Sequence, residues 1–208
     1  MSGRFAAVIL AGGRGERLGG TVKANVTVGG TRLLERVSRA LGTRAEAVLV
    51  ATGAFDSGAA GLLAGQIGIP DLPAGHVGPL AGVVAGIDWC NRAAQPPDLI
   101  LTVAVDTPFL PADFAARMIA ALADSAAAVV AGHAGQDYPT NALWRLSAVA
   151  DLPLRSAAGT APRSLRRLAA ELGATVLDWP ASDGGDPFAN VNTPADLLAL
   201  ERRAARRG

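Results

Sequence analysis

Cysteine, aromatic residues and excess charge are all scarce in this chain. Its 208 residues include one cysteine, Cys90, so no internal disulfide can form and a reducing cytosol is the natural compartment. The formal net charge of +1 gives no indication of a nucleic-acid groove or an acidic partner. No apolar run reaches the roughly 18 residues that a membrane span needs. We therefore expect a cytoplasmic protein that binds neither nucleic acid nor membrane.

Several motifs of common enzymes are also absent. The Walker pattern GxxxxGK[ST] does not occur, and the dinucleotide pattern GxGxxG fails because Leu18 stands where its last glycine would be. His76 and His133 have no cysteine or acid at zinc-ligand spacing, and no GxSxG nucleophile elbow is present. These absences argue against P-loop hydrolases and NAD enzymes, and they leave no zinc site to propose.

The chain has instead a glycine-rich stretch near its start, AAVILAGGRGERLGGTVK at residues 6–23. Its first residues form an apolar run that is typical of a strand buried on both faces. Glycines and three cations follow, Arg14, Arg17 and Lys23. Glycine lets backbone N–H groups approach a ligand closely, so such a loop binds anions, and the cations favour a polyphosphate. A solvated surface turn is the alternative, and the buried strand leading straight into the cations favours the phosphate site.

Strand and helix patterns alternate over residues 1–125, as in a parallel α/β sheet with right-handed crossovers. The expected strands are 6–11, 26–30, 46–52, 67–69, 98–105, 126–131, 137–144 and 174–179. The expected helices are 31–41 with Thr31 as its N-cap, a weak one in 53–65, 80–91, 111–123 with Pro111 at its first position, 161–172, and a last one after Thr193. Thr193, Pro194 and Asp196 have the spacing of a capped helix start.

Ligands of such a sheet collect beyond the carboxyl ends of its strands. The glycine-rich loop, the loop 71–82 and Asp106 all follow strands at that edge. A carboxylate at a strand tip beside a polyphosphate loop is well placed to hold Mg²⁺, although Asp before Thr-Pro is also common in turns. In the segment 188–193, Phe188, Asn190 and Asn192 would share one side of an extended stretch. The two asparagines would then complete a ligand shell, or Asn192 would merely cap the last helix.

This set of groups suits phosphoryl or nucleotidyl transfer, because that chemistry needs mainly positioning and charge neutralisation. The absence of an evident general base is no obstacle if the acceptor is a phosphate monoester, whose second pKa near about 6 leaves it anionic. The tryptophans are interpreted as packing residues. The C-terminal arginines, from Arg202 to Arg207, are interpreted as a solvated helix end.

Five motifs in this order resemble the molybdenum cofactor guanylyltransferases, a branch of the nucleotidyltransferase superfamily. They are LAGGRGERLGG with Lys23, GPLAG at 78–82, VDTPFLP at 105–111, YPTNALW at 138–144 and FANVNTPADL at 188–197. Together they span nearly the whole chain. The resemblance implies an α/β fold: a three-layer α/β/α sandwich with a mostly parallel Rossmann-like sheet and a mixed C-terminal part. It also implies a single domain over residues 1–208, with a nucleotide-binding half at about 1–110 and an acceptor-binding half at about 111–208.

The implied reaction is Mg²⁺-dependent transfer of GMP from GTP to the terminal phosphate of molybdopterin, with release of pyrophosphate. Molybdoenzyme-maturation proteins would be further partners. The resemblance also assigns roles to particular residues. The base and ribose would be held by Leu10, Ala11, Gly12 and Gly13, and the phosphates by Arg17 and Lys23. Asp71 would contact the nucleotide, and Asp106 would bind the metal. The acceptor would be lined by Tyr138, Thr140, Asn190 and Asn192. Arg17, Lys23 and Asp106 would be the catalytic groups.

Three features depart from the family pattern or leave alternatives open. Val22 stands where the family usually has an acid before the lysine, and Gly53 follows the second strand where an asparagine is common. The LAGG form resembles guanylyl enzymes, whereas cytidylyl enzymes tend to have LAAG. The alternatives are a cytidylyl- or other nucleotidyltransferase for molybdopterin or another small phosphorylated acceptor, and a catalytically weak nucleotide-binding partner protein.

Overall fold

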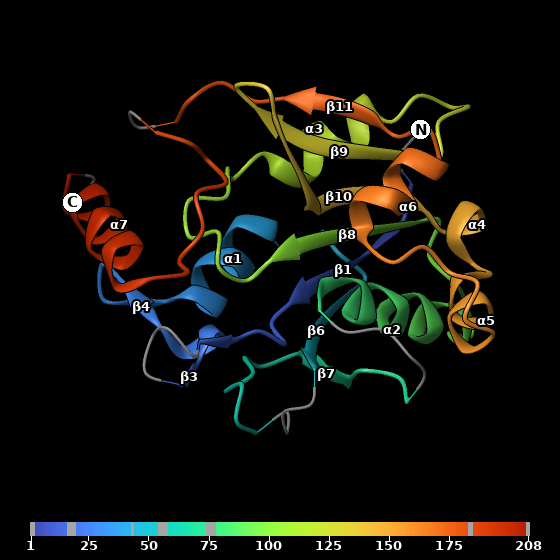
Figure 1. Cartoon of the computed structure of the whole chain (residues 1–208), viewed down its shortest axis with the longest axis horizontal. Helices are drawn as coiled ribbons and strands as arrows, with labels where there is room; N and C mark the ends of the chain where they lie inside the picture. The colour runs from blue at the N-terminus through green and yellow to red at the C-terminus, as the bar shows by residue number, and fades with distance from the viewer. Residues whose placement is uncertain are drawn as a thin grey trace.

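A seven-stranded sheet runs through the centre of the molecule (Figure 1). The computed structural model describes residues 3–15, 20–42, 44–53, 58–73, 78–182 and 185–206. The strands lie in the order β11-β9-β10-β8-β1-β6-β7, and β10 is antiparallel to both of its neighbours while the other pairs are parallel. Their bounds are β1 Phe5–Leu10, β6 Ala47–Gly53, β7 Gln66–Pro70, β8 Leu99–Ala104, β9 Ala128–His133, β10 Gln136–Arg145 and β11 Thr175–Asp178.

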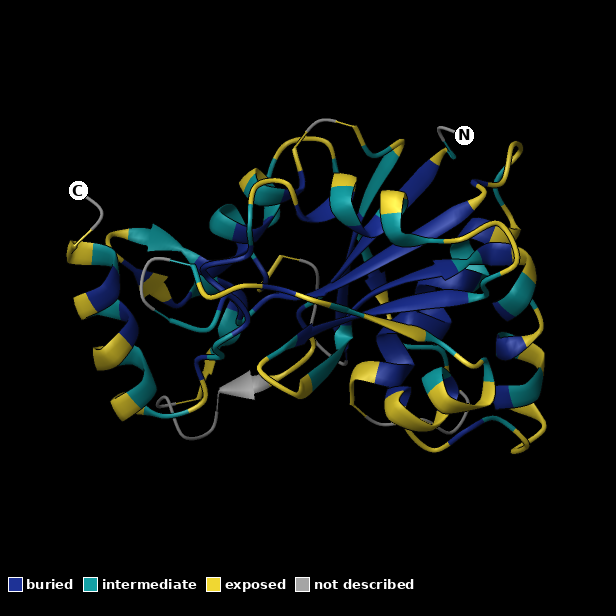
Figure 2. Cartoon of the chain, turned by 90° about the horizontal axis from the view of Figure 1, so that it is seen from above, coloured by how far each residue is buried: buried dark blue, intermediate teal, exposed yellow. Residues whose placement is uncertain are grey.

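Helices cover both faces of the sheet because its central strands are apolar on both faces. All six residues of β8 are buried, as are the first five of β1. One core packs α1 (Leu33–Leu41), α3 (Phe114–Ala121) and part of α7 (Pro194–Ala205) against the sheet. The opposite core packs α2 (Pro79–Asn91), α4 (Leu146–Val149), α5 (Leu152–Ala157) and α6 (Leu165–Glu171). Figure 2 shows this buried centre between exposed helical surfaces. The predicted three-layer α/β/α sandwich is confirmed.

Three helix predictions need correction, and two short helices were not predicted. Thr31 is not an N-cap: Gly29 and Gly30 have φ of 57° and 69° and turn β4 (Thr27–Val28) back into β5 (Thr31–Arg32), so Thr31 pairs with Val28. Pro111 does not begin α3, which starts at Phe114 after a turn in which the Phe114 N–H donates to the Pro111 carbonyl at 3.0 Å.

The weak helix predicted in 53–65 is absent from the described residues 58–65. Gly61 and Gly65 there have φ of 59° and 80°, which no continuous right-handed helix permits. The two helices that were not predicted are α4 and α5. They have 4 and 6 residues, too few to show a helical period.

The start of α7 confirms the predicted cap. The Thr193 side chain accepts from the Asp196 N–H, and the Asp196 carboxylate accepts from the Thr193 N–H in return. The prediction of a solvated end is wrong for Arg203, which is 6% exposed. Its guanidinium donates to the carbonyls of Asp186 and Ser182 at 2.6 and 2.5 Å, and its burial lowers the pKa of Arg203. Arg202 and Arg206 are exposed as expected, and Arg207 lies outside the described residues.

The tryptophans pack as predicted, since Trp144 and Trp179 are fully buried and Trp89 is half-buried. In the described part of the chain, no helix has both the length and the apolar character that crossing a membrane requires.

The close contact of α2 with β1 gives a stability prediction. A Cβ at Gly86 would lie 2.7 Å from Cγ2 of Val8, a fully buried side chain. Gly86→Ala should gain about 1 kcal/mol of helix propensity but lose about 1–3 kcal/mol to overpacking. We expect a net decrease in the free energy of unfolding, measured by urea denaturation. A stabilised variant would show that α2 does not approach the sheet this closely.

Candidate active site

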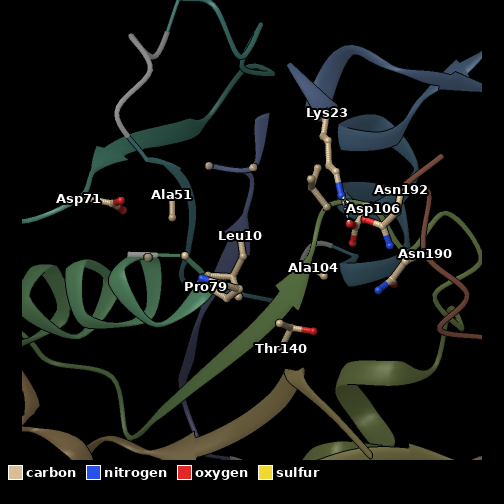
Figure 3. Close-up of a pocket in the computed structure, with 15 residues that line it drawn as sticks. Leu10, Lys23, Ala51, Asp71, Pro79, Ala104, Asp106, Thr140, Asn190 and Asn192 are labelled. Carbon is tan, nitrogen blue, oxygen red and sulfur yellow. Dashed lines mark hydrogen bonds and ion pairs between the residues drawn. The ribbon is translucent and has the colours of Figure 1, made fainter. Parts of the chain in front are cut away.

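A cavity of about 320 Å³ opens at the carboxyl ends of β1, β6 and β8 (Figure 3). Its walls come from the loop after β1, the start of α2, the segment after β8, the middle of β10 and the strand-free segment before α7. The residues that line it are Leu10, Gly12, Gly13, Lys23, Ala51, Asp71, Gly78, Pro79, Gly82, Ala104, Val105, Asp106, Thr140, Asn190 and Asn192.

Lys23 and Asp106 form an ion pair at one end of this cavity. The Lys23 ammonium donates to the Asp106 carboxylate and to the Asn192 amide oxygen, at 2.6 Å in each case. The ionic side chains are each 14% exposed, so water screens their attraction only partly. An ammonium group has three donors, and these two bonds leave one for a ligand. Three segments far apart in the sequence thus converge on one charge.

The asparagines beside this ion pair supply further oxygen atoms. The Asn190 amide oxygen is buried without a hydrogen-bond partner among the described residues. The neighbouring Val191 N–H donates to the Asp106 carbonyl at 3.1 Å, which fixes this segment next to the tip of β8. A carboxylate and an unpartnered amide oxygen are hard donors of the kind that Mg²⁺ prefers. No group of three or more His, Cys, Asp or Glu side chains suited to a metal occurs among the described residues.

Glycine is required where the ends of β1 and β6 meet. A Cβ at Gly12 would lie 2.9 Å from the Cα and N of Gly53, and Gly53 has a φ of 66°. The neighbouring Ala11 is buried, and its N–H donates to the Ala51 carbonyl at 2.8 Å. Gly13 is less crowded, since its Cβ would meet only the Lys23 side chain at 3.6 Å. The loop therefore offers exposed backbone at Gly12 and Gly13 to the cavity.

Small residues also shape the opposite wall of the cavity. A Cβ at Gly82 would lie 2.8 Å from Cβ of Ala51, so α2 can approach the sheet here only without a side chain. Asp71 follows β7, and in Figure 3 it lies at the other end of the cavity from Lys23 and Asp106. Partial burial raises the pKa of the Asp71 carboxyl group. The site thus has one end with the ion pair and another with a single carboxyl group.

Nine of the residues singled out from the sequence come together in this cavity. They are Leu10, Gly12, Gly13, Lys23, Asp71, Asp106, Thr140, Asn190 and Asn192. Arg17 lies outside the described residues. Ala11 is buried beneath the loop, and the Tyr138 hydroxyl points to Asp186, at 2.5 Å, instead of lining the cavity.

The segment 188–193 is not the regular extended stretch that we expected. The Ala189 N–H donates to the Asp186 carbonyl at 3.4 Å, which makes a turn. Phe188 is fully buried, with its ring centroid 5.9 Å from that of Trp179 and 5.1 Å from that of Tyr138. Only the two asparagines reach the cavity, and the Asn192 side chain binds Lys23 rather than capping α7.

The sequence analysis missed six lining residues as site residues: Ala51, Gly78, Pro79, Gly82, Ala104 and Val105. Gly78, Pro79 and Gly82 stand in the GPLAG motif, which was noticed but given no role. The others are small apolar residues at strand ends and carry no chemical signal of their own. It also missed Asp186, whose carboxylate accepts from the Phe188 N–H at 2.7 Å.

Comparisons with known proteins show the family. Residues 7–176 match the family model of the MobA-like NTP transferase domain. The chain is 38% identical over 199 residues to a molybdenum cofactor guanylyltransferase from Cereibacter sphaeroides, covering 95% of this chain and 96% of the relative. It is 40% identical over 201 residues to one from Rhodobacter capsulatus, covering 96% of each.

The fold has solved counterparts as well. A crystal structure of molybdopterin-guanine dinucleotide biosynthesis protein A from Archaeoglobus fulgidus matches with a TM-score of 0.71 and 22% identity, covering 97% of this chain and 99% of that one. This match confirms the fold, and the sequence matches confirm the family that the five motifs indicated. The chain belongs to the MobA-like nucleotidyltransferase family, among the molybdenum cofactor guanylyltransferases.

Proposed function

We propose that this chain transfers GMP from GTP to the terminal phosphate of molybdopterin and releases pyrophosphate. As a member of its family it is a nucleotidyltransferase, and such enzymes generally use a divalent metal. The observation that carries the proposal is the contact of Lys23 with Asp106 inside a cavity that also exposes the glycine loop. A cation, a metal-binding carboxylate and open backbone on one cavity are what a triphosphate needs.

The residues have distinct tasks in this reaction. Lys23 and the backbone at Gly12 and Gly13 hold the phosphates of GTP, while Asp71 contacts the nucleotide at the other end of the cavity. Asp106 and the amide oxygen of Asn190 fit Mg²⁺, which when bound would neutralise phosphate charge. The remaining charge is balanced by Lys23 and, as the family resemblance implies, by Arg17.

The acceptor side needs little more than orientation. A phosphate oxygen of molybdopterin attacks the α-phosphorus of GTP and forms a new P–O bond. The bond from the α-phosphorus to the bridging oxygen breaks, and its electron pair leaves with pyrophosphate. The acceptor phosphate is already ionised near neutral pH, so no side chain has to remove a proton. Thr140, Asn190 and Asn192 place it, and we assign the nucleotide to the half at about residues 1–110 and the acceptor to the half at about residues 111–208.

Val22 does not support the alternative that the chain is a catalytically weak nucleotide-binding partner protein. It pairs with Arg14 in the β2–β3 hairpin (Arg14–Gly15 with Thr21–Val22) and packs partly against the core. It is not among the residues that line the cavity, and Lys23 reaches Asp106 beside it. A hydrophobic residue at this position is therefore compatible with turnover.

The nucleotide and acceptor can be tested directly. We expect pyrophosphate release from GTP that depends on molybdopterin and Mg²⁺ and stops with EDTA. CTP should give little release, and GTP without the acceptor none. Release with CTP alone would replace the guanylyl assignment with the cytidylyl alternative, and release with neither nucleotide would contradict the proposed function.

The role of Asp106 gives a second test. Asp106→Asn preserves the size of the side chain and an oxygen acceptor for Lys23, but it removes the negative charge. We expect kcat to fall by about 10²–10³-fold, in the range found when one electrostatic group is removed from a site, with little change in the thermal unfolding temperature. Asp113→Asn is the matched control, because Asp113 is exposed and makes no cap bond. Equal activities of the two variants would remove Asp106 from the metal site.

The ion pair also predicts how the ligand-free protein binds metal. Because the Lys23 ammonium neutralises Asp106, a divalent cation competes with it. Lys23→Met should therefore bind Mn²⁺ on the order of 10-fold more tightly than the wild type when no nucleotide is present. Electron paramagnetic resonance of free Mn²⁺ measures this, and Lys23→Arg serves as the charge-preserving control. Identical affinities for all three proteins would show that Lys23 does not shield the carboxylate.

A further inference from the structure

Asn190 and Asn192 stand on a segment that has neither helical nor strand structure. We call residues 186–192 the asparagine strap. Its downstream end is held by Asp196, whose carboxylate accepts from the N–H groups of Asn192 and Thr193 at 3.0 and 2.8 Å. Its middle is held by the bond from the Val191 N–H to Asp106. Asn190 lies between this middle contact and the upstream end, where Phe188 is buried, so the groups that fix the upstream end help to place it.

Asp186 fixes that upstream end through its carboxylate and its carbonyl, both of which accept hydrogen bonds. One carboxylate oxygen accepts from the Phe188 N–H at 2.7 Å, and the other accepts from the Tyr138 hydroxyl at 2.5 Å. The Asp186 carbonyl accepts from the Arg203 guanidinium at 2.6 Å. Arg203 in turn lies over the Phe109 ring, with 4.1 Å between its Cζ and the ring centroid. The strap is thus tied to β10 and to α7 at a single residue.

Tyr138 faces this junction and not the cavity. Its ring packs on Phe188, and its neighbour two positions on, Thr140, is the β10 residue that lines the cavity. Burial, followed by the hydrogen bond to Asp186 and the charge of Asp186, raises the pKa of Tyr138 to about 12. The hydroxyl therefore remains protonated and donates to Asp186 at any working pH.

We propose that Asp186 is a positioning residue of the transfer reaction, and that Tyr138 acts through Asp186 to hold Asn190 and Asn192 at the cavity. This inference rests on the proposed function of the two asparagines. It replaces the role that the family resemblance implied for Tyr138, which was contact with the acceptor. The two readings differ in a measurable way, because a residue that acts only through another has no effect once that other is removed.

A double-mutant cycle separates the two readings. The proteins are the wild type, Tyr138→Phe, Asp186→Ala and the double variant, each measured for kcat and for the KM of GTP and of molybdopterin. We expect kcat to fall about 10-fold in Tyr138→Phe and up to about 10²-fold in Asp186→Ala, since small displacements of positioning groups have effects of this size. The KM for GTP should not change, and the double variant should be no slower than Asp186→Ala.

Two further variants make the test specific. Asp186→Asn keeps an acceptor for the Phe188 N–H and offers a donor to the Tyr138 oxygen, so it should retain most of kcat. Ser38→Ala is the matched control for hydroxyl loss: Ser38 donates to the Leu34 carbonyl and accepts from Gln66, far along the chain from the strap. It should lower stability without altering kcat.

The outcomes distinguish this inference from the proposed function. If the effects of the two substitutions on kcat multiply in the double variant, and Tyr138→Phe raises the KM for molybdopterin, then Tyr138 contacts the acceptor directly. That result would overturn the inference. Lower stability with unchanged kinetics would do the same. Amide hydrogen exchange of peptides covering 186–192 gives a readout that needs no turnover: exchange should rise there in Tyr138→Phe and not in Ser38→Ala. A wild type that transfers no GMP would contradict the proposed function, while unchanged exchange would still overturn the role of Tyr138 and Asp186.

Discussion

The ion pair between Lys23 and Asp106 is the interaction on which the site depends. It joins the segment after β1 to the tip of β8, and Asn192 brings the last segment of the chain to the same ammonium group. Removing two charges from water costs free energy that a single pair rarely recovers in full. The presence of such a pair is therefore better explained by the ligands of the proposed function than by a contribution to the stability of the fold. In the proposed function, it keeps a cation and a carboxylate at the place where the phosphates and the metal would bind.

The fold makes this contact possible by placing β1 beside β8 in the middle of a parallel sheet. The loops that follow these two strands must then emerge at the same edge. Small residues open the space between them: Gly12 lets the β1 loop pass against Gly53, and Gly82 lets α2 approach Ala51. The core on each face of the sheet fixes the strands from whose ends these loops start. The asparagine strap belongs to no helix or strand: Phe188 and Val191 anchor it in the core, and Asp186 and Asp196 hold its two ends.

Much of this arrangement could be predicted from the sequence. The buried central strands were predicted to within two residues, because apolar runs between charged or glycine-rich stretches leave few alternatives: β8 is Leu99–Ala104 against an expected 98–105. The spacing of Thr193, Pro194 and Asp196 predicted where α7 starts. The cations of the glycine-rich loop and the carboxylate after a buried strand made Lys23 and Asp106 candidates, and the structure places both in one cavity. These patterns involve only residues that are close together in the chain, so a single sequence is enough to detect them.

Some failures are local, and others involve contacts between distant segments. Thr31 has the side chain of a helix cap, but the two glycines before it close a hairpin and place it in β5. Arg203 looks solvated because its partners, the carbonyls of Ser182 and Asp186, belong to a turn with no recognisable pattern. Tyr138 and Asp186 lie 48 positions apart, and nothing in either neighbourhood predicts their bond.

The most direct test of the account is a crystal structure with a non-hydrolysable GTP analogue and Mn²⁺. The account predicts anomalous density for the metal at the Asp106 carboxylate, with the triphosphate between Lys23 and the glycine loop and the base toward Asp71. A nucleotide bound outside this cavity, or a metal held by groups other than Asp106, would contradict it.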